Sequence, residues 1–300
     1  MGARTLAGIG CFVLATFGFG VMDAGIKYLT AEYDTWQIMF FRALFSLVPI
    51  GFLVARSGGL ATLRTHSILS HAGRSLMGVV AAFGFFYSYA HMPLADVYAL
   101  SFAAPLFMTA LSVPILKEKV GWRRWAAVLV GFCGVLVMLR PGQGMLTLMA
   151  LMPLGAAAFY ALSMLFVRVL ARTESNGAIT FYFVTTMAVV SAFFMVPVWK
   201  TPDLTGFLLL AFVGIVGGVA QILFTNAFRL APPSLLAPFE YVAMIWAVGF
   251  GFLLFGDVPD TAIWIGCAIV AASGLYIVHR ETVLHRQATM RAGLDGDAIR

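Results

Sequence analysis

Charged residues are scarce in this chain. Asp, Glu, Lys and Arg make up 11% of its 300 residues, whereas an ordinary soluble domain contains about 25%. Hydrophobic residues account for 61%, and the chain holds 27 Phe and 30 Gly. Glycine is more frequent in transmembrane helices than in soluble ones, and aromatic rings gather at membrane interfaces. This composition argues against a soluble domain and predicts an all-α integral membrane protein.

Cysteine is also rare, and its spacing indicates neither redox nor metal chemistry. Cys11, Cys133 and Cys267 lie in apolar runs, without a CxxC pattern or a nearby His partner. We expect them to be small core residues, with no disulfide and no metal site. The sequence also lacks an HExxH motif, paired His clusters and a Ser–His arrangement in one region. These absences weigh against an enzyme, and no cofactor is expected.

The charge balance is basic, with a formal net charge of +6, but the basic residues are scattered between the apolar runs. Such scatter is typical of residues that set membrane topology. We therefore expect a lipid bilayer, and no nucleic acid, among the partners of this chain.

Polar, Gly and Pro positions divide the sequence into ten apolar segments. Each approaches the roughly 20 residues that a helix needs to cross a hydrocarbon core. The first resembles a signal peptide, but its apolar run continues past Asp23 without a small-residue cleavage site, so it is interpreted as a span. The segments lie near residues 6–28, 36–55, 72–91, 95–116, 123–140, 146–170, 177–198, 204–227, 233–255 and 261–279.

The basic residues between these segments predict the orientation of the spans. If the N-terminus is cytoplasmic and the sides alternate, 15 of the 19 Lys and Arg residues fall on the cytoplasmic side, 3 fall on the other, and Arg42 lies inside the second span. Cytoplasmic connections are enriched in Lys and Arg. Both termini are therefore predicted to be cytoplasmic, with residues 280–300 as a cytoplasmic tail.

The two halves of the chain resemble each other. Ala24–Phe41 aligns with Leu165–Tyr182, and further matches keep their order along the chain. Because each half holds five spans, an odd number, the two repeats must have opposite orientations. Inverted repeats occur in many secondary transporters, whose substrate site lies near the midplane between the halves. The predicted repeats cover residues 6–140 and 146–279.

Two long stretches carry a resemblance to a known family. They read YAHMPLADVYALSFAAPLFMTALSVPILKEKVGWRRWAAVLVGFCGVLVMLRPG and NAFRLAPPSLLAPFEYVAMIWAVGFGFLLFGDVP. They resemble the two EamA domains of the drug/metabolite transporter (DMT) superfamily, and the similarity covers about residues 6–279. The resemblance implies ten helices in two inverted five-helix repeats, a central substrate cavity open to one side at a time, and no ATP-binding part. The absence of a GxxxxGKS or GxxxxGKT motif agrees with the last point.

Within the superfamily, the pattern LAPPSLLAPFEYVAMIWA, the pair Asp23 and Lys27, and the run Phe40-Phe41-Arg42 look most similar to bacterial uptake members. These include riboflavin and S-adenosylmethionine importers. The resemblance thus implies a secondary transporter of a small-molecule substrate in the bacterial inner membrane, as a monomer or homodimer. Aromatic amino acid exporters share the fold, so export of amino acids or drugs stays open.

Ionisable residues within the predicted spans need partners or water, because Asp, Lys or Arg at the bilayer centre costs about 2.5–3.5 kcal/mol each. Asp23 and Lys27 stand four residues apart on one helix face, where they can pair along the helix. The alternative is that they line the cavity. Arg42 lies about one and a half turns into the second span, where an ion pair with Asp23 is plausible.

Glu240 is the strongest single candidate for substrate binding or coupling. It lies about two turns into the ninth span, with no basic residue within reach on its own helix. Its carboxyl group must be neutral, paired with another helix, or exposed to water. Proton uptake there would couple transport to a gradient, and a carboxylate would bind a cationic substrate. The structural alternative is a bond to Arg42 or to a hydroxyl group.

Neutral polar and aromatic residues complete the predicted cavity wall. Tyr and Trp rings can stack on a flat heteroaromatic substrate while the amide of Gln221 reads its edge. Packing is the alternative for every aromatic candidate. The remaining candidates are Tyr87, Tyr98, Ser101, Asn226, Tyr241 and Trp246.

Prolines in the spans indicate kinks, because proline lacks an N–H and its ring clashes with the preceding turn. The prolines are Pro105, Pro114, Pro153 and Pro238. Two other classes remain open at this point. A membrane enzyme has no supporting motif, and a structural membrane protein explains the spans but not a carboxyl group within one of them.

Overall fold

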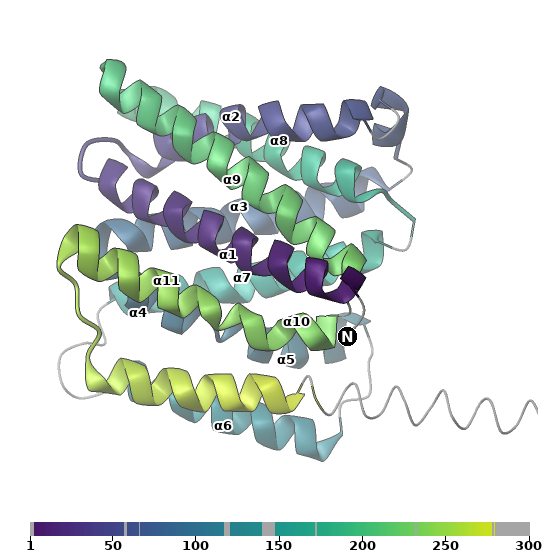
Figure 1. Cartoon of the computed structure of the whole chain (residues 1–300), viewed down its shortest axis with the longest axis vertical. Coiled ribbons are helices and arrows are strands. Elements are labelled where there is room, and N and C mark those ends of the chain that lie inside the picture. Colours follow the sequence, from purple (N-terminus) through teal and green to yellow (C-terminus); the bar gives the residue numbers. More distant parts are fainter. Residues whose placement is uncertain are drawn as a thin grey trace, which may run out of the picture.

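The apolar segments fold into helices that run between the same two ends of a bundle (Figure 1). The computed structural model describes residues 3–56, 59–65, 67–116, 121–139, 148–171, 173–231, 233–277 and 279. The predicted tail, 280–300, lies outside these residues. All regular structure within them is helical.

The first half of the chain contains six α-helices and one 3₁₀ turn. They are α1 (Ala3–Leu29), α2 (Thr35–Arg56), η1 (Gly59–Leu63), α3 (Ile68–His91), α4 (Leu94–Ser101), α5 (Ala104–Leu116) and α6 (Trp122–Leu139). The second half contains α7 (Leu148–Leu170), α8 (Asn176–Met195), η2 (Val196–Val198), α9 (Leu204–Leu230), α10 (Pro233–Glu240), α11 (Val242–Phe250), the π-helical turn η3 (Gly251–Phe255) and a final helix, Thr261–Ile277.

Each of the ten predicted segments contains helix in the described residues. Seven helical segments are long and apolar enough to cross a membrane, and three further apolar helices are shorter. The seven are Leu6–Leu29, Thr35–Arg56, Ile68–His91, Leu94–Ile115, Met149–Leu170, Asn176–Val198 and Leu204–Leu230. The shorter three are Trp125–Leu139, Val242–Phe255 and Thr261–Ile277. The predicted all-helical membrane protein is thus confirmed.

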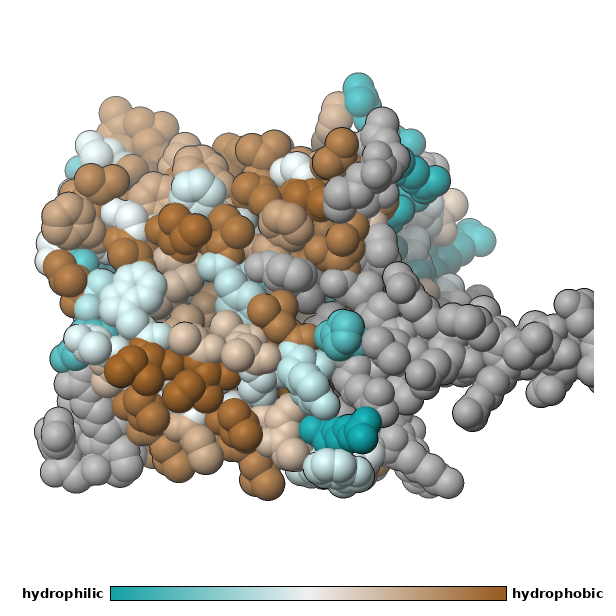
Figure 2. Space-filling model, turned by 60° about the horizontal axis from the view of Figure 1, so that its bottom comes forward, coloured by the Kyte–Doolittle hydropathy of each residue, from teal (hydrophilic) through white to brown (hydrophobic). Residues whose placement is uncertain are grey.

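The surface of the bundle matches a lipid environment. Large apolar side chains are exposed on helices from both halves, among them Phe52, Val189 and Leu253. Figure 2 shows apolar side chains across the middle of one face and hydrophilic ones toward its ends. Soluble monomers rarely expose apolar surface on this scale.

The helix pairs that join the two halves are symmetric. Helix α1 packs on α9 and α3 on α7, α2 packs on α8, and α2 also packs on α9 as α3 does on α8. Exchanging α1, α2 and α3 for α7, α8 and α9 turns this set of pairs into itself. Two repeats of one fold, related by a twofold axis, would produce the same pairing.

Helix α6 and the final helix approach each other through glycines (Figure 1). A Cβ atom added to Gly134 would lie 2.9 Å from the carbonyl oxygen of Gly266. The Ser273 hydroxyl donates a hydrogen bond to the Ala127 carbonyl at 2.5 Å. Small residues and interhelical hydrogen bonds are the usual means of holding helices together in lipid.

Two membrane segments are broken, and both breaks lie near a proline for which the sequence predicts a kink. Helix α4 gives way to α5 at Phe102 and Ala103, just before Pro105, and α10 gives way to α11 at Tyr241, three residues after Pro238. Proline cannot donate the helical hydrogen bond, which weakens the turn before it. This accounts for the break before Pro105, but not for the break at Tyr241, which follows Pro238. By contrast, the helix continues through the other two predicted prolines, in α5 and α7.

Candidate functional site

Ionisable and polar side chains gather in two clusters inside the bundle. One lies toward the end where α1 finishes, and the other includes the break between α10 and α11. The Asp23 cluster consists of Asp23, Arg42, Tyr89 and Tyr98, from α1, α2, α3 and α4. The Glu240 cluster is defined by the electrostatic interaction of Tyr160 of α7 with Arg74 of α3 and with Glu240 of α10, and no hydrogen bond or ion pair joins these three side chains.

Asp23 is held by two tyrosines. The hydroxyl groups of Tyr98 and Tyr89 both donate to Asp23 Oδ2, at 2.5 and 3.1 Å. Asp23 is only 6% exposed, so these bonds satisfy a carboxyl group that has little access to solvent. Short bonds from a hydroxyl to a carboxylate are among the stronger hydrogen bonds in proteins. They join α1, α3 and α4 at one point.

Arg42 does not form the expected ion pair with Asp23. Its Nε lies 3.2 Å from the sulfur of Met22, its Nη1 lies 3.4 Å from the sulfur of Met187, and its guanidinium carbon stands 5.2 Å from the ring centre of Phe86. Arg42 and Asp23 still interact electrostatically. Thioether sulfur is a weak acceptor, so Arg42 keeps a charge without a strong partner.

Lys27 does not pair with Asp23 along α1, which is one of the two arrangements that the sequence left open. The Lys27 Nζ atom lies 3.3 Å from Asp257 Oδ2 and donates to the Met92 carbonyl at 2.7 Å. Gly256, with φ of 71°, ends η3 in the left-handed conformation that glycine adopts readily, directly before Asp257. Lys27 therefore ties the end of α1 to the end of η3, in the other half of the chain.

Glu240 is the last residue of α10 and stands at the break before α11. It is half-buried, and neither a hydrogen bond nor an ion pair joins its carboxyl group to another described side chain. It interacts electrostatically with Tyr160 and Tyr241. Neither the expected structural bond to Arg42 nor one to a hydroxyl is present.

Arg74 is the residue of the Glu240 cluster that was not predicted from the sequence, because it was counted among the cytoplasmic basic residues. It is 7% exposed, and its guanidinium carbon lies 3.8 Å from the ring centre of Phe183. Its Nε and Nη1 atoms are buried without a hydrogen-bond partner. It interacts electrostatically with Tyr160. The available signal was that Arg74 falls two residues inside the predicted span 72–91.

Three further candidates belong to the neighbouring packing. The ring of Tyr241 meets that of Phe102 edge-on, with centroids 5.0 Å apart. Trp246 packs against Phe17 of α1 at 5.1 Å, and its Nε1 is buried without an acceptor. The Ser101 hydroxyl donates to the carbonyl of Tyr98 within its own helix, so its hydrogen bond is local.

The side chains of the last three candidates form no hydrogen bond with a described residue of either cluster. Tyr87 stacks on Phe83 and on His91 of its own helix. Gln221 and Asn226 are half-buried on α9, and no hydrogen bond ties either side chain to another described residue. Their amides keep free donors and acceptors.

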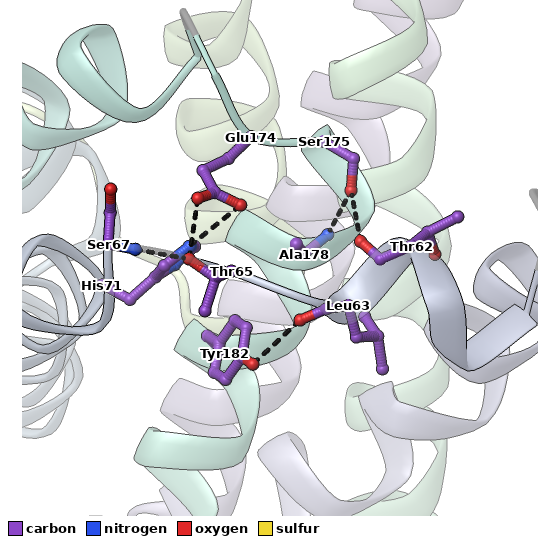
Figure 3. A network of polar contacts seen from close by, with 9 residues as sticks. All are labelled: Thr62, Leu63, Thr65, Ser67, His71, Glu174, Ser175, Ala178 and Tyr182. Carbon is purple, nitrogen blue, oxygen red and sulfur yellow. Dashed lines mark hydrogen bonds and ion pairs between the residues drawn. The ribbon is translucent and has the colours of Figure 1, made fainter.

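A third polar network joins the halves at the end of the bundle where α3 and α8 begin (Figure 3). Glu174, between α7 and α8, accepts a hydrogen bond from Thr65 at 2.7 Å and lies 3.8 Å from Nε2 of His71. Tyr182 of α8 donates to the Leu63 carbonyl at 2.9 Å. These contacts join the segment between α2 and α3 to the second half of the chain.

The opposite end is also bridged. Gln37 of α2 donates to the Lys200 carbonyl at 2.6 Å and accepts from the Lys200 N–H at 2.9 Å, and the Lys27–Asp257 pair stands at the same end. Polar contacts between the halves thus exist at both ends of the bundle.

The described residues offer no metal centre. No group of three or more His, Cys, Asp or Glu side chains among them is placed to hold a metal ion.

The sequence pattern of the EamA-like transporter family matches residues 6–140 and 147–279. The chain is 29% identical over 276 residues to the S-adenosylmethionine uptake transporter of Rickettsia bellii and 28% identical over 277 residues to the riboflavin transporter of Vibrio cholerae. It is 29% identical over 274 residues to the pseudopaline exporter of Pseudomonas aeruginosa. Each alignment covers 91% of this chain, and 94%, 93% and 93% of the relatives in turn.

A crystal structure that is 18% identical in sequence superposes with a TM-score of 0.62, covering 95% of this chain and 98% of the other. At that identity it shows a shared fold alone. The expected resemblance to EamA transporters, and to uptake members for riboflavin and S-adenosylmethionine, is confirmed by the family match and the relatives. The chain therefore belongs to the EamA-like transporter family and is a multi-pass membrane transporter of small metabolites, not an enzyme.

Proposed function

We propose that this protein is a secondary active transporter that moves a metabolite of the S-adenosylmethionine or riboflavin class across the bacterial inner membrane by alternating access. Bacterial relatives named for each substrate align over more than nine-tenths of this chain. One structural observation carries the proposal: Glu240, without a bonded partner, ends α10 at the break where the two discontinuous segments meet.

Broken helices are a common way to build a substrate site inside a membrane. The ends of the half-helices leave backbone groups free to bind, and protein surrounds them so that lipid does not. Helix α11 packs against α4, so the two breaks come from different halves and face each other. A site at this place would be reached from either side by a movement of one half against the other.

Each cluster has a role in this proposal. Glu240 binds the substrate or carries the coupling proton, because a carboxyl group without a fixed partner can change its protonation without breaking a structural bond. Asp23, with Tyr98 and Arg42, forms the wall of the site toward the other end. Gln221 and Asn226 supply neutral hydrogen bonds from α9.

The contacts at the two ends act as gates that open in turn. The Lys27–Asp257 pair closes one end and the Glu174 network closes the other. The side chains of His71 and Glu174 are buried, whereas the Lys27–Asp257 pair has partial access to water, where an ion pair contributes about 0–1 kcal/mol. Contacts of that strength can be broken and remade in each cycle.

The orientation is part of the proposal. We propose two inverted repeats, over residues 6–140 and 146–279, with both termini and the tail 280–300 in the cytoplasm. The symmetric helix packing between the halves and the distribution of Lys and Arg both support this orientation. Reporter fusions or thiol labelling at both termini would test it. A labelled terminus on the periplasmic side would refute this topology.

Export is the alternative direction. It is favoured by the pseudopaline exporter, a relative aligned as fully as the importers. Within this alternative the substrate is an aromatic amino acid or a drug, and the fold and the site are the same.

Transport by purified protein in proteoliposomes tests the proposal. Labelled S-adenosylmethionine and riboflavin are supplied with and without an imposed pH gradient, to wild type and to Glu240→Gln. Glu32→Gln is the matched control, because Glu32 is exposed and forms only a surface pair with Lys200.

We expect wild type and Glu32→Gln to transport one of the two substrates, and Glu240→Gln to lose most of the transport or its response to the gradient. The proposal fails if wild type moves neither compound in either direction. It also fails if Glu240→Gln matches wild type under every condition.

A further inference from the structure

Arg74 occupies a slot that the fold shapes for a guanidinium group. The slot is formed by the ring of Phe183 on α8 and by Gly78, one turn further along α3. A Cβ atom at position 78 would lie 2.7 Å from Arg74 Nη1 and 2.7 Å from the Phe183 ring. Any larger residue at Gly78 would therefore displace the guanidinium.

The charge in this slot has no counter-ion. The Nε and Nη1 atoms of Arg74 are buried without an acceptor, and no described acidic side chain forms an ion pair with it. Arginine keeps its proton in proteins. Burying a charged group whose donor is unsatisfied is costly, and the Phe183 ring offsets only part of this cost. A missing anionic group would account for the arrangement.

Glu174, the acidic residue that contacts the start of α3, is already occupied. Glu174 accepts the Thr65 hydroxyl and lies beside His71, one turn before Arg74 on α3 (Figure 3). Tyr160 of α7 interacts electrostatically with both Arg74 and Glu240. One tyrosine thus connects an unpaired cation in the first half to an unpaired carboxyl group in the second.

We propose that Arg74 and Glu240 bind the two opposite charges of a zwitterionic substrate, with a carboxylate on Arg74 and an ammonium or sulfonium group near Glu240. This inference rests on the proposed function and narrows its substrate class. Arginine is suited to carboxylates because its planar fork can donate two parallel hydrogen bonds. A substrate with both charges neutralises both residues when it binds.

The inference separates the two substrates named above. S-adenosylmethionine carries a carboxylate, an ammonium and a sulfonium group, so it matches both residues. Riboflavin has no ionised group at neutral pH, so it would leave both unpaired. The site therefore selects an amino acid headgroup over a neutral flavin.

Competition binding to the purified full chain tests the carboxylate directly. Labelled S-adenosylmethionine is bound to wild type, and unlabelled S-adenosylmethionine, its decarboxylated form and riboflavin compete. The decarboxylated compound lacks only the group assigned to Arg74. Variants Arg74→Gln and Arg74→Lys are compared with Arg229→Gln, which removes an exposed cation at the end of α9.

We expect wild type and Arg229→Gln to prefer S-adenosylmethionine over its decarboxylated form by about tenfold or more, the value of one charged hydrogen bond. Arg74→Gln should lose this preference, and Arg74→Lys should keep part of it. Because Arg74→Lys retains the charge, it keeps the test valid if Arg74→Gln does not fold.

The inference is overturned if Arg74→Gln retains the preference, or if riboflavin binds and S-adenosylmethionine does not. In that second case riboflavin transport that depends on Glu240 would leave the proposed function standing. Binding and transport of neither compound would overturn both.

Discussion

The rings of Phe102 and Tyr241 meet edge to face, with centroids 5.0 Å apart, and each residue marks the break in a discontinuous membrane segment. One break belongs to each half of the chain. The two places where helical hydrogen bonds of three-residue spacing replace those of four-residue spacing are thus held together by an aromatic contact, beside Glu240. This contact fixes where the halves meet and, with it, the position of the candidate site.

A double-mutant cycle measures that contact. Phe102→Leu and Tyr241→Leu each remove one ring, and we expect a coupling of about 0.5–1.5 kcal/mol between them, the range for an aromatic pair. Thermal unfolding of purified protein supplies the four stabilities. Tyr241→Phe is the control, because it keeps the ring and should keep the coupling. Simple additivity of the two Leu variants would show that the contact is incidental.

The spans could be predicted from sequence because their cause is local, whereas the prolines indicated the breaks only in part: two of the four prolines predicted to kink a span lie in continuous helix, and the break at Tyr241 follows Pro238. Apolar length decides which segments lie in lipid, and a proline weakens the turn before it. Glu240 could be singled out for the same reason, since a carboxyl group within an apolar span is recognised without knowledge of its partners. Partners were not predictable. The partner of Lys27 is Asp257, in the other half, and only the fold brings them together.

Arg74 shows a second limit. Counting Lys and Arg by connection places a residue near the end of a span on the cytoplasmic side, whether it faces water or turns inward. The direction of its side chain depends on Phe183 and Gly78, which provide the slot. Only Gly78 lies on the same helix, so periodicity within α3 could not have revealed the site.

The tyrosines around Asp23 should contribute measurably to stability. Tyr98→Phe removes the shorter of the two hydrogen bonds to a buried carboxyl group, and we expect a loss of about 1.5–3 kcal/mol, as for bonds to charged groups. Tyr89→Phe, which removes the longer bond of 3.1 Å, should cost less. Thermal unfolding of both variants gives the order. Equal or reversed losses would contradict the hydrogen-bond geometry.

Cross-linking tests the two gates. In a variant whose native cysteines are replaced, cysteines at positions 27 and 257 can be joined by a short thiol-specific linker, and so can cysteines at positions 65 and 174. We expect each cross-link to stop transport, because alternating access requires each end to open in every cycle. Cleavage of the linker should restore activity.

A matched pair of cysteines within one half, at the exposed positions 76 and 80 of α3, serves as the cross-linking control. These positions lie one turn apart on a continuous helix, so a linker there should not stop transport. Full activity with either end locked would show that the end does not open, and would count against alternating access through that gate.

Replacing Lys27 or Arg74 by methionine should affect the thermal stability of the protein differently. Lys27→Met removes an ion pair and a hydrogen bond that are both formed, so thermal stability should fall. Arg74→Met removes a buried charge whose donors have no acceptor, and replacing such a charge by an apolar side chain is often neutral or stabilising. The unfolding temperature of Arg74→Met should stay the same or rise, while substrate binding should be lost. Such a trade-off is usual for functional residues, which are not optimised for stability. A marked fall in the stability of Arg74→Met without ligand would assign Arg74 a structural role instead.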